Sequence, residues 1–398
     1  MYLCIMLKGY RYRIEPNNVQ ITLLNKHFGA CRFLYNLALE TKIYAYLSQK
    51  KTLSYYDLAG QLPDLKKECE WLKEIDSQAL QQSLINLDKA FTQFFKHGAK
   101  FPNFKSKRNK QAFRSPHPSK IVIENNKISI PKFKQGIKII IDRAFKGEIK
   151  SAVFSKTPTE KYYISILVKT GKEVPKTKPI KENTAVGIDL GIKDFIVTSE
   201  GIKTNNPKYL KNTITRLKVL QSRMKNKKKG SMNSKKAYKR IALVHEKIAF
   251  QRKDFLHKLS TELVNNHDTL CFENLKVSNM IKNHCLAQSI SDAGWSMFVE
   301  MCKYKATWNG KNILQIGTFE PSTKMCNSCG ATNHTLTLAD REWTCKCGVF
   351  HDRDINAARN IKSFALRNSG AASPGVPVEM LAIAKSMKQE VIMAGNYL

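Results

Sequence analysis

Three acidic residues, far apart in the sequence, occupy positions at which proteins often place metal-binding carboxylates. Asp189 ends the apolar run 184–189, Glu273 ends the run 269–273, and Asp354 opens a predicted helix. Each acid alone has an ordinary explanation, as a turn cap or as a charge that the helix dipole favours. A central sheet, however, gathers side chains from the carboxyl ends of distant strands, so the three acids together predict one shared site.

Carboxylates gathered in this way suit Mg²⁺, which takes hard oxygen ligands and keeps several of its waters. Hydrolysis of a phosphodiester needs an activated water in line with a leaving oxygen, and two Mg²⁺ ions about 4 Å apart stabilise both oxygens. No Ser/His/Asp arrangement stands out in this half of the sequence. Asp189, Glu273 and Asp354 are therefore predicted to hold two Mg²⁺ ions and to support cleavage of nucleic acid.

A second candidate metal site lies next to Asp354 in the sequence. Its expected ligands form two cysteine pairs, Cys326 with Cys329 and Cys345 with Cys347. Pairs at this separation are typical of a zinc ribbon with a closed, structural site. The second pair is one residue shorter than usual, so His334 or His351 could replace one sulfur. Gly330 and Gly348 follow the two pairs, where a tight knuckle turn favours glycine.

The charge of the chain indicates a polyanionic partner. The 398 residues include 67 Lys and Arg against 32 Asp and Glu, a formal net charge of +35. Neutralisation of phosphates by Lys and Arg supplies most of the sequence-independent binding to nucleic acid. No apolar run approaches the roughly 20 residues that a membrane-spanning helix requires. The six cysteines outside the two pairs are scattered, as in a protein of the reducing cytoplasm.

Two long basic segments are the expected contact surfaces. Residues 96–120 hold eight Lys and Arg, residues 216–240 hold eleven, and neither segment contains an acid. In the first segment Phe101, Phe104 and Phe113 alternate with the cations, which suits backbone contact combined with base stacking. A charged, solvated surface is the alternative. The residues expected to contact nucleic acid here are Lys105, Lys107, Arg108, Arg223, Lys227 and Lys228.

The N-terminal half alternates between β-rich and helical sequence. Residues 1–15 and 121–170 contain short β-branched runs separated by turn residues, which predict a small barrel or sandwich. Apolar residues at helical spacing over 18–47 and 77–95 predict two amphipathic helices inserted between these strands. Residues 172–181, which include two prolines, are the expected linker to the second half.

The C-terminal half alternates strands with helices, the pattern of an α/β domain. Strands are predicted at 184–189, 195–198, 269–273 and 312–316, and helices at 207–266 and 295–308. The first two strands are expected to form a hairpin, and the first and third deliver Asp189 and Glu273. Residues 368–398, which contain several glycines and prolines, are predicted to be a loosely held tail.

The motifs that carry these residues resemble those of one known family. They are Gly187–Leu190 with Gly191, Phe272–Leu275, the two cysteine pairs and the segment 352–361, which reads DRDINAARNI. Together they are similar to the signature of TnpB, a family of transposon-encoded, RNA-guided endonucleases related to type V CRISPR effectors. The similarity extends over nearly the whole chain, apart from about the last thirty residues.

The resemblance implies a multidomain α/β fold: an N-terminal wedge-type β-barrel with a helical recognition insertion, then an RNase H-like RuvC nuclease domain with an inserted zinc ribbon. The implied domains are 1–16 with 115–180 (barrel), 17–114 (insertion), 181–318 with 350–367 (RuvC), 319–349 (ribbon) and 368–398 (flexible tail). Asp189, Glu273 and Asp354 would form the metal-binding triad, because the family places its third acid just before x-Asn-Ala-Ala. Asp352 would then lie outside the triad.

The function implied is Mg²⁺-dependent cleavage of double-stranded DNA beside a short target-adjacent motif, directed by a transposon-derived guide RNA. A cytoplasmic protein, monomeric in its RNA complex and without membrane partners, is expected. Two alternatives stay open: an RNA-guided DNA-binding regulator without nuclease activity, and a miniature type V CRISPR effector. An unguided junction resolvase would not need the large N-terminal half.

One helix is a candidate reader of the target-adjacent motif. Its polar residues are Ser77, Gln78, Gln81 and Gln82. Glutamines four residues apart present their amides on one helix face, and Gln can pair with the N6 and N7 atoms of adenine in the major groove. An exposed polar face without a binding role is the alternative.

Overall fold

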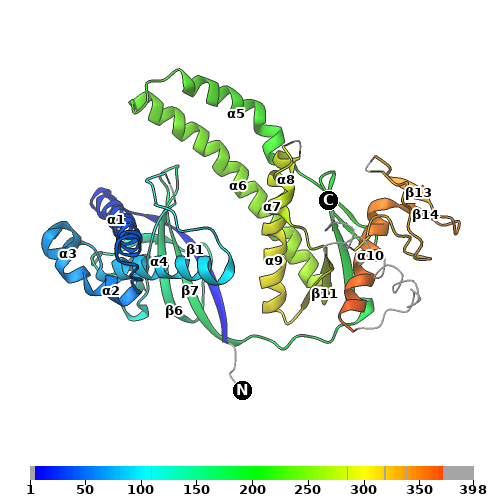
Figure 1. Cartoon of the computed structure of the whole chain (residues 1–398), viewed down its shortest axis with the longest axis horizontal. Helices are drawn as coiled ribbons and strands as arrows, with labels where there is room; N and C mark the ends of the chain where they lie inside the picture. The colour runs from blue at the N-terminus through cyan, green and yellow to red at the C-terminus, as the bar shows by residue number, and fades with distance from the viewer. Residues whose placement is uncertain (1–4, 109, 285, 318–319, 338, 371–398) are drawn as a thin grey trace. The chain divides into compact units, whose positions relative to one another are not determined.

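The computed structural model describes residues 5–370 except 109, 285, 318–319 and 338. The chain divides into two compact units (Figure 1), the first ending at Glu173 and the second starting at Val174. This division falls inside the expected linker, 172–181. Most of the predicted tail, residues 371–398, lies outside the described residues. Among the described residues, no helix combines the length and the apolarity that crossing a membrane requires.

The first unit is built on a seven-stranded antiparallel sheet with the order β2-β6-β7-β1-β5-β4-β3. Its strands are β1 (Ile5–Glu15), β2 (Gln111–Ser115), β3 (Val122–Glu124), β4 (Lys127–Ser129), β5 (Ile137–Ile140), β6 (Glu148–Lys156) and β7 (Tyr162–Glu173). Alternate residues over most of β7 are buried, which is the pattern of a sheet with one covered face. Closure of this sheet into a barrel stays a prediction.

Helices lie between β1 and β2 in the sequence: α1 (Asn18–Gln49), α2 (Tyr55–Gly60), α3 (Leu62–Glu68) and α4 (Ser77–His97). The first of them starts with a capping box, in which the side chains of Asn17 and Gln20 each bond the other's backbone N–H. The predicted helices are confirmed as α1 and α4, and strands β1, β3, β4, β5 and β7 fall on the predicted β-rich segments 1–15 and 121–170. Strand β2 lies outside these segments, and no separate strand was predicted at β6.

Strand β2 corrects the interpretation of the first basic segment. Phe113, which was expected to stack on bases, is 4% exposed and stacks on Phe154 in the core instead. Side chains alternate between the two faces along β2, and a strand residue that points inward cannot reach a ligand on the solvent side. Phe101 and Phe104 remain exposed, although Phe101 also packs edge-on against Phe94.

The second unit contains a five-stranded mixed sheet with the order β10-β9-β8-β11-β12. Its strands are β8 (Ala185–Leu190), β9 (Asp194–Thr198), β10 (Lys203–Asn205), β11 (Thr269–Phe272) and β12 (Asn312–Gln315). The predicted hairpin of β8 with β9 is confirmed, and β11 lies parallel to both β8 and β12. The helices are α5 (Tyr209–Lys225), α6 (Met232–Asn266), α7 (Val277–Met280), α8 (Ala287–Ala293), α9 (Trp295–Trp308) and α10 (Arg353–Asn368).

Helix α10 crosses strand β8 at very short range, and a glycine makes this approach possible. A Cβ atom built on Gly187 would overlap the carbonyl oxygen of Ala358 and lie 2.9 Å from the backbone nitrogen of Lys362. Ala357 and Ala358 are small and buried. The first glycine of the GIDLG segment is therefore required by packing, because only a residue without a side chain fits beneath α10.

This contact leads to a prediction about stability. Gly187→Ala should destabilise the second unit by about 3 kcal/mol, the upper end of the usual cost of overpacking, because the added methyl group meets rigid backbone instead of a movable side chain. Urea unfolding measures the effect. Gly29→Ala is the matched control, since Gly29 lies inside α1 with open space around its Cβ position. The control should be neutral or stabilising by about 0.5–1 kcal/mol, and equal stability of both variants would contradict the packing argument.

Candidate metal centres and nucleic-acid surfaces

Two neighbouring parallel strands bring Asp189 and Glu273 to the same edge of the sheet. In the register of β8 and β11, Ile188 is paired with Phe272, and Val186 with Leu270. The next residue after each member of the first pair is an acid. Because both strands run in the same direction, the two acids lie side by side at the carboxyl edge, as the sequence predicted.

Helix α10 supplies the third acid, and the two acids at its start have different roles. Asp352 is the N-cap, and its carboxylate accepts hydrogen bonds from the backbone N–H groups of Asp354 and Ile355. The same carboxylate pairs with the Lys203 ammonium at 2.5 Å. Asp354 lies in the first turn of the helix, and its carboxylate does not act as the cap. The cap explains why Asp352 is an acid without invoking metal binding.

The other two acids act electrostatically on Asp189. Burial, and then the negative charges of Glu273 and Asp354, raise the pKa of Asp189 to about 8, while the Arg353 guanidinium acts in the opposite direction. Mutual repulsion of this kind is relieved when a cation binds between the acids. The donor set consists of carboxylate oxygens, which fits Mg²⁺ better than a soft metal.

Two arginines and a serine hold the other two acids. Asp354 accepts hydrogen bonds from Arg353 Nε at 3.2 Å and from Arg341 Nη1 at 3.3 Å. Glu273 Oε1 accepts a hydrogen bond from Ser322 Oγ at 2.5 Å. These arginines and this serine were not predicted from the sequence, since nothing in their spacing separates them from ordinary surface residues.

The four predicted cysteines do come together. The sulfur atoms of Cys326, Cys329, Cys345 and Cys347 all lie within 4.8 Å of one another, as four ligands of one metal ion would. Gly330 and Gly348 have φ values of 77° and 83°, and each donates its N–H to the carbonyl of the first cysteine of the preceding pair. Both knuckle turns thus need the left-handed conformation that glycine adopts freely.

The histidine alternatives are separated by the geometry. His351 Nε2 lies 3.0 Å from Cys326 Sγ, and the ring packs on Trp343. His334 is exposed. His351 therefore contacts a sulfur ligand from outside the four-cysteine cluster, on strand β14 (Phe350–Asp352), which pairs with β13 (Glu342–Thr344). The cluster itself is complete with four thiols.

Two buried asparagines, to which no role was assigned from the sequence, fix this ribbon to α10. Asn356 and Asn360 are 1% and 0% exposed, and their amides donate to the carbonyl oxygen of Met325 at 2.7 and 2.6 Å. Asn356 also accepts a hydrogen bond from the backbone N–H of Asn327 at 2.9 Å. Two asparagines four residues apart on the apolar face of a helix could have indicated this attachment from the sequence, because a buried amide requires hydrogen-bond partners.

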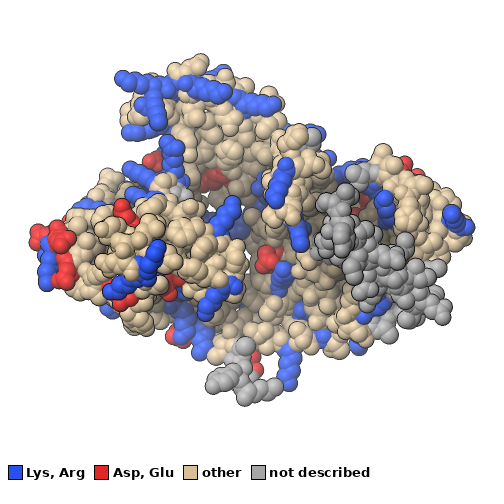
Figure 2. Space-filling model, viewed as in Figure 1, with Lys and Arg blue, Asp and Glu red and all other residues tan. Residues whose placement is uncertain are grey.

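The second basic segment forms the tip of a helical hairpin. The predicted helix 207–266 is interrupted at 226–231, and the two halves α5 and α6 pack together over Leu217 and Val244. Lys and Arg side chains line this hairpin in Figure 2. Arg223, Lys227 and Lys228 are all exposed on it. Their positions are compatible with the predicted backbone contacts, which stay a prediction.

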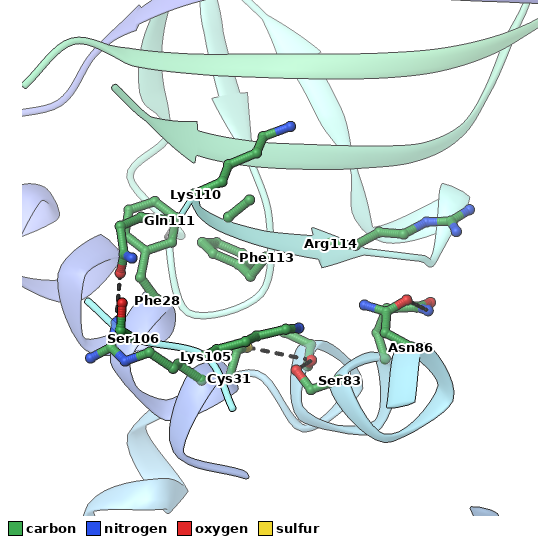
Figure 3. A pocket seen from close by; sticks show the side chains of 14 residues that line it. Phe28, Cys31, Ser83, Asn86, Lys105, Ser106, Lys110, Gln111, Phe113 and Arg114 are labelled. Atoms are coloured by element: carbon green, nitrogen blue, oxygen red, sulfur yellow. Dashed lines mark hydrogen bonds between the residues drawn. The ribbon is translucent and has the colours of Figure 1, made fainter. Parts of the chain in front are cut away.

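The predicted motif-reading residues of α4 divide between two environments. Ser77 and Gln81 are exposed, whereas Gln78 is half-buried and Gln82 is 5% exposed. Gln82 lines a cleft between α1, α4 and β2 (Figure 3), where its amide donates to Asn86 Oδ1 at 3.2 Å. The face that carries Gln78 and Gln82 is therefore turned inward, and only Gln82 lies in the cleft.

Cations surround the same cleft. Lys105 and Arg114 line it (Figure 3), and the Lys105 ammonium lies 3.5 Å from the centre of the Tyr35 ring. Lys107 and Arg108 follow on the exposed connection to β2. A cleft that combines amides with cations offers hydrogen-bond donors, which can bind the acceptor atoms of a base edge and of a phosphate.

The opposite pKa shifts of two nearby acids lead to a prediction for the protein in magnesium-free buffer without chelator. The unfolded chain ionises Asp189 near 3.8, but the raised pKa in the folded protein is about 8, so Asp189 costs stability increasingly as the pH rises between these values. Asp189→Asn should raise the melting temperature, and the gain should grow from about pH 4 to about pH 8 and then level off.

Asp352→Asn is the control with the opposite sign. Although burial acts against it, the Lys203 ammonium and the N–H of Ile355 lower the pKa of Asp352. This carboxylate therefore stabilises the protein above its unfolded pKa and stops doing so as the pH falls through its folded pKa. Asp352→Asn should lower the melting temperature at neutral pH. Equal shifts for both variants at pH 8 would contradict the crowding of acids around Asp189.

Comparisons with known proteins agree with this architecture. Residues 165–284 match a family described as a probable transposase, and residues 295–361 match the Cas12f1-like TNB domain. Residues 6–51 match a domain described as helix-turn-helix, although β1 and α1 occupy this segment. A Cas12f1 chain, solved in a complex with sgRNA and target DNA, superposes with a TM-score of 0.55 at 12% identity, covering 90% of this chain and 99% of that one. This similarity concerns the fold.

Two relatives cover nearly the whole sequence. A protein of Streptomyces pristinaespiralis named "Putative RNA-guided DNA endonuclease" is 37% identical over 367 residues, which are 91% of this chain and 90% of the relative. Escherichia coli K12 has the "Putative RNA-guided DNA endonuclease InsQ", 32% identical over 374 residues, with 89% and 91% covered. With such identity over about nine-tenths of both chains, and with the motifs described above, this chain belongs to the TnpB family.

Proposed function

We propose that the chain is an RNA-guided DNA endonuclease that cleaves target DNA at the site of Asp189, Glu273 and Asp354. The observation that supports this proposal best is the convergence of the three acids, two on adjacent parallel strands and one on α10. The names of the two relatives point to the same activity. We assign the surrounding fold, with its five-stranded mixed sheet, to the RNase H-like RuvC class that the family resemblance implies.

The residues of the site fit the binding of two Mg²⁺ ions. When bound, these ions would supply an activated water and stabilise the leaving oxygen of the phosphodiester. Asp189 and Glu273 lie at the ends of paired strands, which give the site a fixed geometry. Asp354 is held by Arg341 and Arg353, which balance its charge in the absence of a cation. At neutral pH the Asp189 carboxyl holds a proton that it must release when a cation binds, because its pKa is about 8.

The cysteine cluster is proposed to hold one structural Zn²⁺. Four thiolates complete a tetrahedral site and leave no position for a water or a substrate. The cluster lies in the segment that separates β12 from α10, so this metal would stabilise the connection that leads to Asp354. Binding free energy of such a site is folding free energy, and the ribbon is expected to depend on it.

The partners proposed are a transposon-derived guide RNA and double-stranded target DNA. The exposed cations of the α5–α6 hairpin and of residues 105–108 would contact their backbones. We expect the protein to act as a monomer with its RNA in the cytoplasm. An RNA-guided regulator without nuclease activity is the second candidate, but the complete acid triad favours cleavage. A miniature type V CRISPR effector would share this chemistry.

Substitution of the acids tests the proposed activity. Asp189→Ala, Glu273→Ala and Asp354→Ala should each abolish cleavage of both DNA strands, because one site has to serve both. Guided DNA binding should survive, since its affinity comes from base pairing and basic surfaces elsewhere. Gel assays of cleavage and of binding, with RNA that co-purifies with the protein, measure the two effects.

Asp352→Ala is the internal control for this experiment. It removes a helix cap, which costs about 1 kcal/mol, but it leaves all three proposed metal ligands in place. Its cleavage should therefore remain within a few-fold of the wild-type rate. Cleavage by Asp354→Ala together with inactivity of Asp352→Ala would show that Asp352 is the metal ligand, and cleavage by Asp189→Ala would exclude the proposed site.

The cleft of Figure 3 is the proposed reader of the target-adjacent motif. Gln82→Ala should change the motif preference by about 1–3 kcal/mol, the discrimination that one bidentate pair with a base provides. Gln81→Ala, on the outer face of the same helix, separates the role of the cleft from that of the exposed surface. Cleavage of a library with a randomised flank measures both preferences. If neither variant alters the preferred flank, α4 does not read the motif.

A further inference from the structure

Ser322 is in contact with one of the three acids although it belongs to the cysteine-rich segment, the connection between β12 and α10 that carries the four cysteines. Its hydroxyl donates to Glu273 Oε1 at 2.5 Å, and the serine is 4% exposed. Glu273 itself lies just beyond the end of β11, at Phe272, so strand pairing does not order its side chain. The orientation of the Glu273 carboxylate thus depends on a residue 49 positions later in the sequence.

The backbone around Ser322 is held from two sides. Its carbonyl oxygen accepts a hydrogen bond from the Asn360 amide at 2.7 Å, and its N–H donates to the carbonyl of Glu320 at 2.8 Å. The same Asn360 amide reaches Met325, three residues further along. Ser322 is therefore fixed to the buried face of α10, the helix that carries Asp354.

These contacts continue without interruption into the cysteine cluster. Met325 and Asn327, which α10 holds through Asn356, are the two neighbours of Cys326. Cys326 is fully buried and is the first of the four ligands. A metal at the cluster would therefore fix the first knuckle, the turn from Cys326 to Cys329. This knuckle and α10 together would hold Ser322 in place.

We propose that Ser322 is a positioning residue for Glu273, and that Asn360 and the cysteine knuckle hold it in place. A glutamate side chain has three rotatable bonds, and its loss of freedom on binding opposes metal affinity. The hydrogen bond to Oε1 orders the side chain in advance and leaves Oε2 available as a metal ligand. Partners in this outer layer typically change metal affinity or activity by about 10-fold to 100-fold. This role rests on the proposed function of the acids.

Mn²⁺ binding to the RNA-bound protein, without DNA, tests the positioning role. Free Mn²⁺ is counted by electron paramagnetic resonance during titration, so that no turnover is needed. Ser322→Ala should weaken the Mn²⁺ affinity of the acid site at least about tenfold while one zinc per chain is retained. Asn360→Ala should also weaken the Mn²⁺ affinity. In the described part of the chain, Asn360 bonds the segment that carries the cysteines and none of the three acids, so its effect would have to pass through Ser322.

Ser260→Ala is the matched control, because Ser260 is a fully buried, hydrogen-bonded serine of α6. It should leave the Mn²⁺ affinity unchanged. Wild-type affinity in Ser322→Ala, or weakening that appears only when zinc is also absent, overturns the positioning role while the proposed function stands. If Asp189→Asn binds Mn²⁺ as tightly as the wild-type protein does, the proposed function is overturned, and the positioning role with it.

Discussion

The close crossing of α10 over β8 at Gly187 is the constraint on which the arrangement of the acids depends. Strand pairing alone brings Asp189 and Glu273 together, but it cannot reach the third acid. The missing Cβ of Gly187 and the buried Ala357 and Ala358 let the helix approach the sheet, so that the first turn of α10 meets the carboxyl edge. The cysteine ribbon enters immediately before this helix and is attached to it by Asn356 and Asn360.

Assembling three carboxylates is unfavourable for the folded protein by itself. Burial first, and then the charges of Glu273 and Asp354, raise the pKa of Asp189, so its carboxyl holds a proton at neutral pH that a solvated one would release. Arg341 and Arg353 offset part of the charge at Asp354, and a cation would offset the rest. Such a cost is common where function requires a crowded arrangement of charges.

The sequence predicted those features that depend on local pattern. Helix α9 has the predicted bounds of 295–308, and β8 and β11 end at or beside the acids because buried parallel strands are continuous apolar runs. Strands β2 and β6 were missed because polar residues interrupt their apolar pattern, and Phe113 was misread for the same reason. Contacts between distant residues, such as Ser322 with Glu273, have no local signal and became visible only in the structure.

The proposed metal site at the three acids is tested most directly by a structure of the protein with guide RNA, target DNA and Mn²⁺, in which anomalous scattering locates the metal. We expect manganese peaks, about 4 Å apart if two ions bind, between the carboxylates of Asp189, Glu273 and Asp354. Zinc would appear separately among the four cysteine sulfurs. Cleaved DNA in a complex whose manganese lies elsewhere, with these three acids free of metal, would contradict the proposed catalytic site.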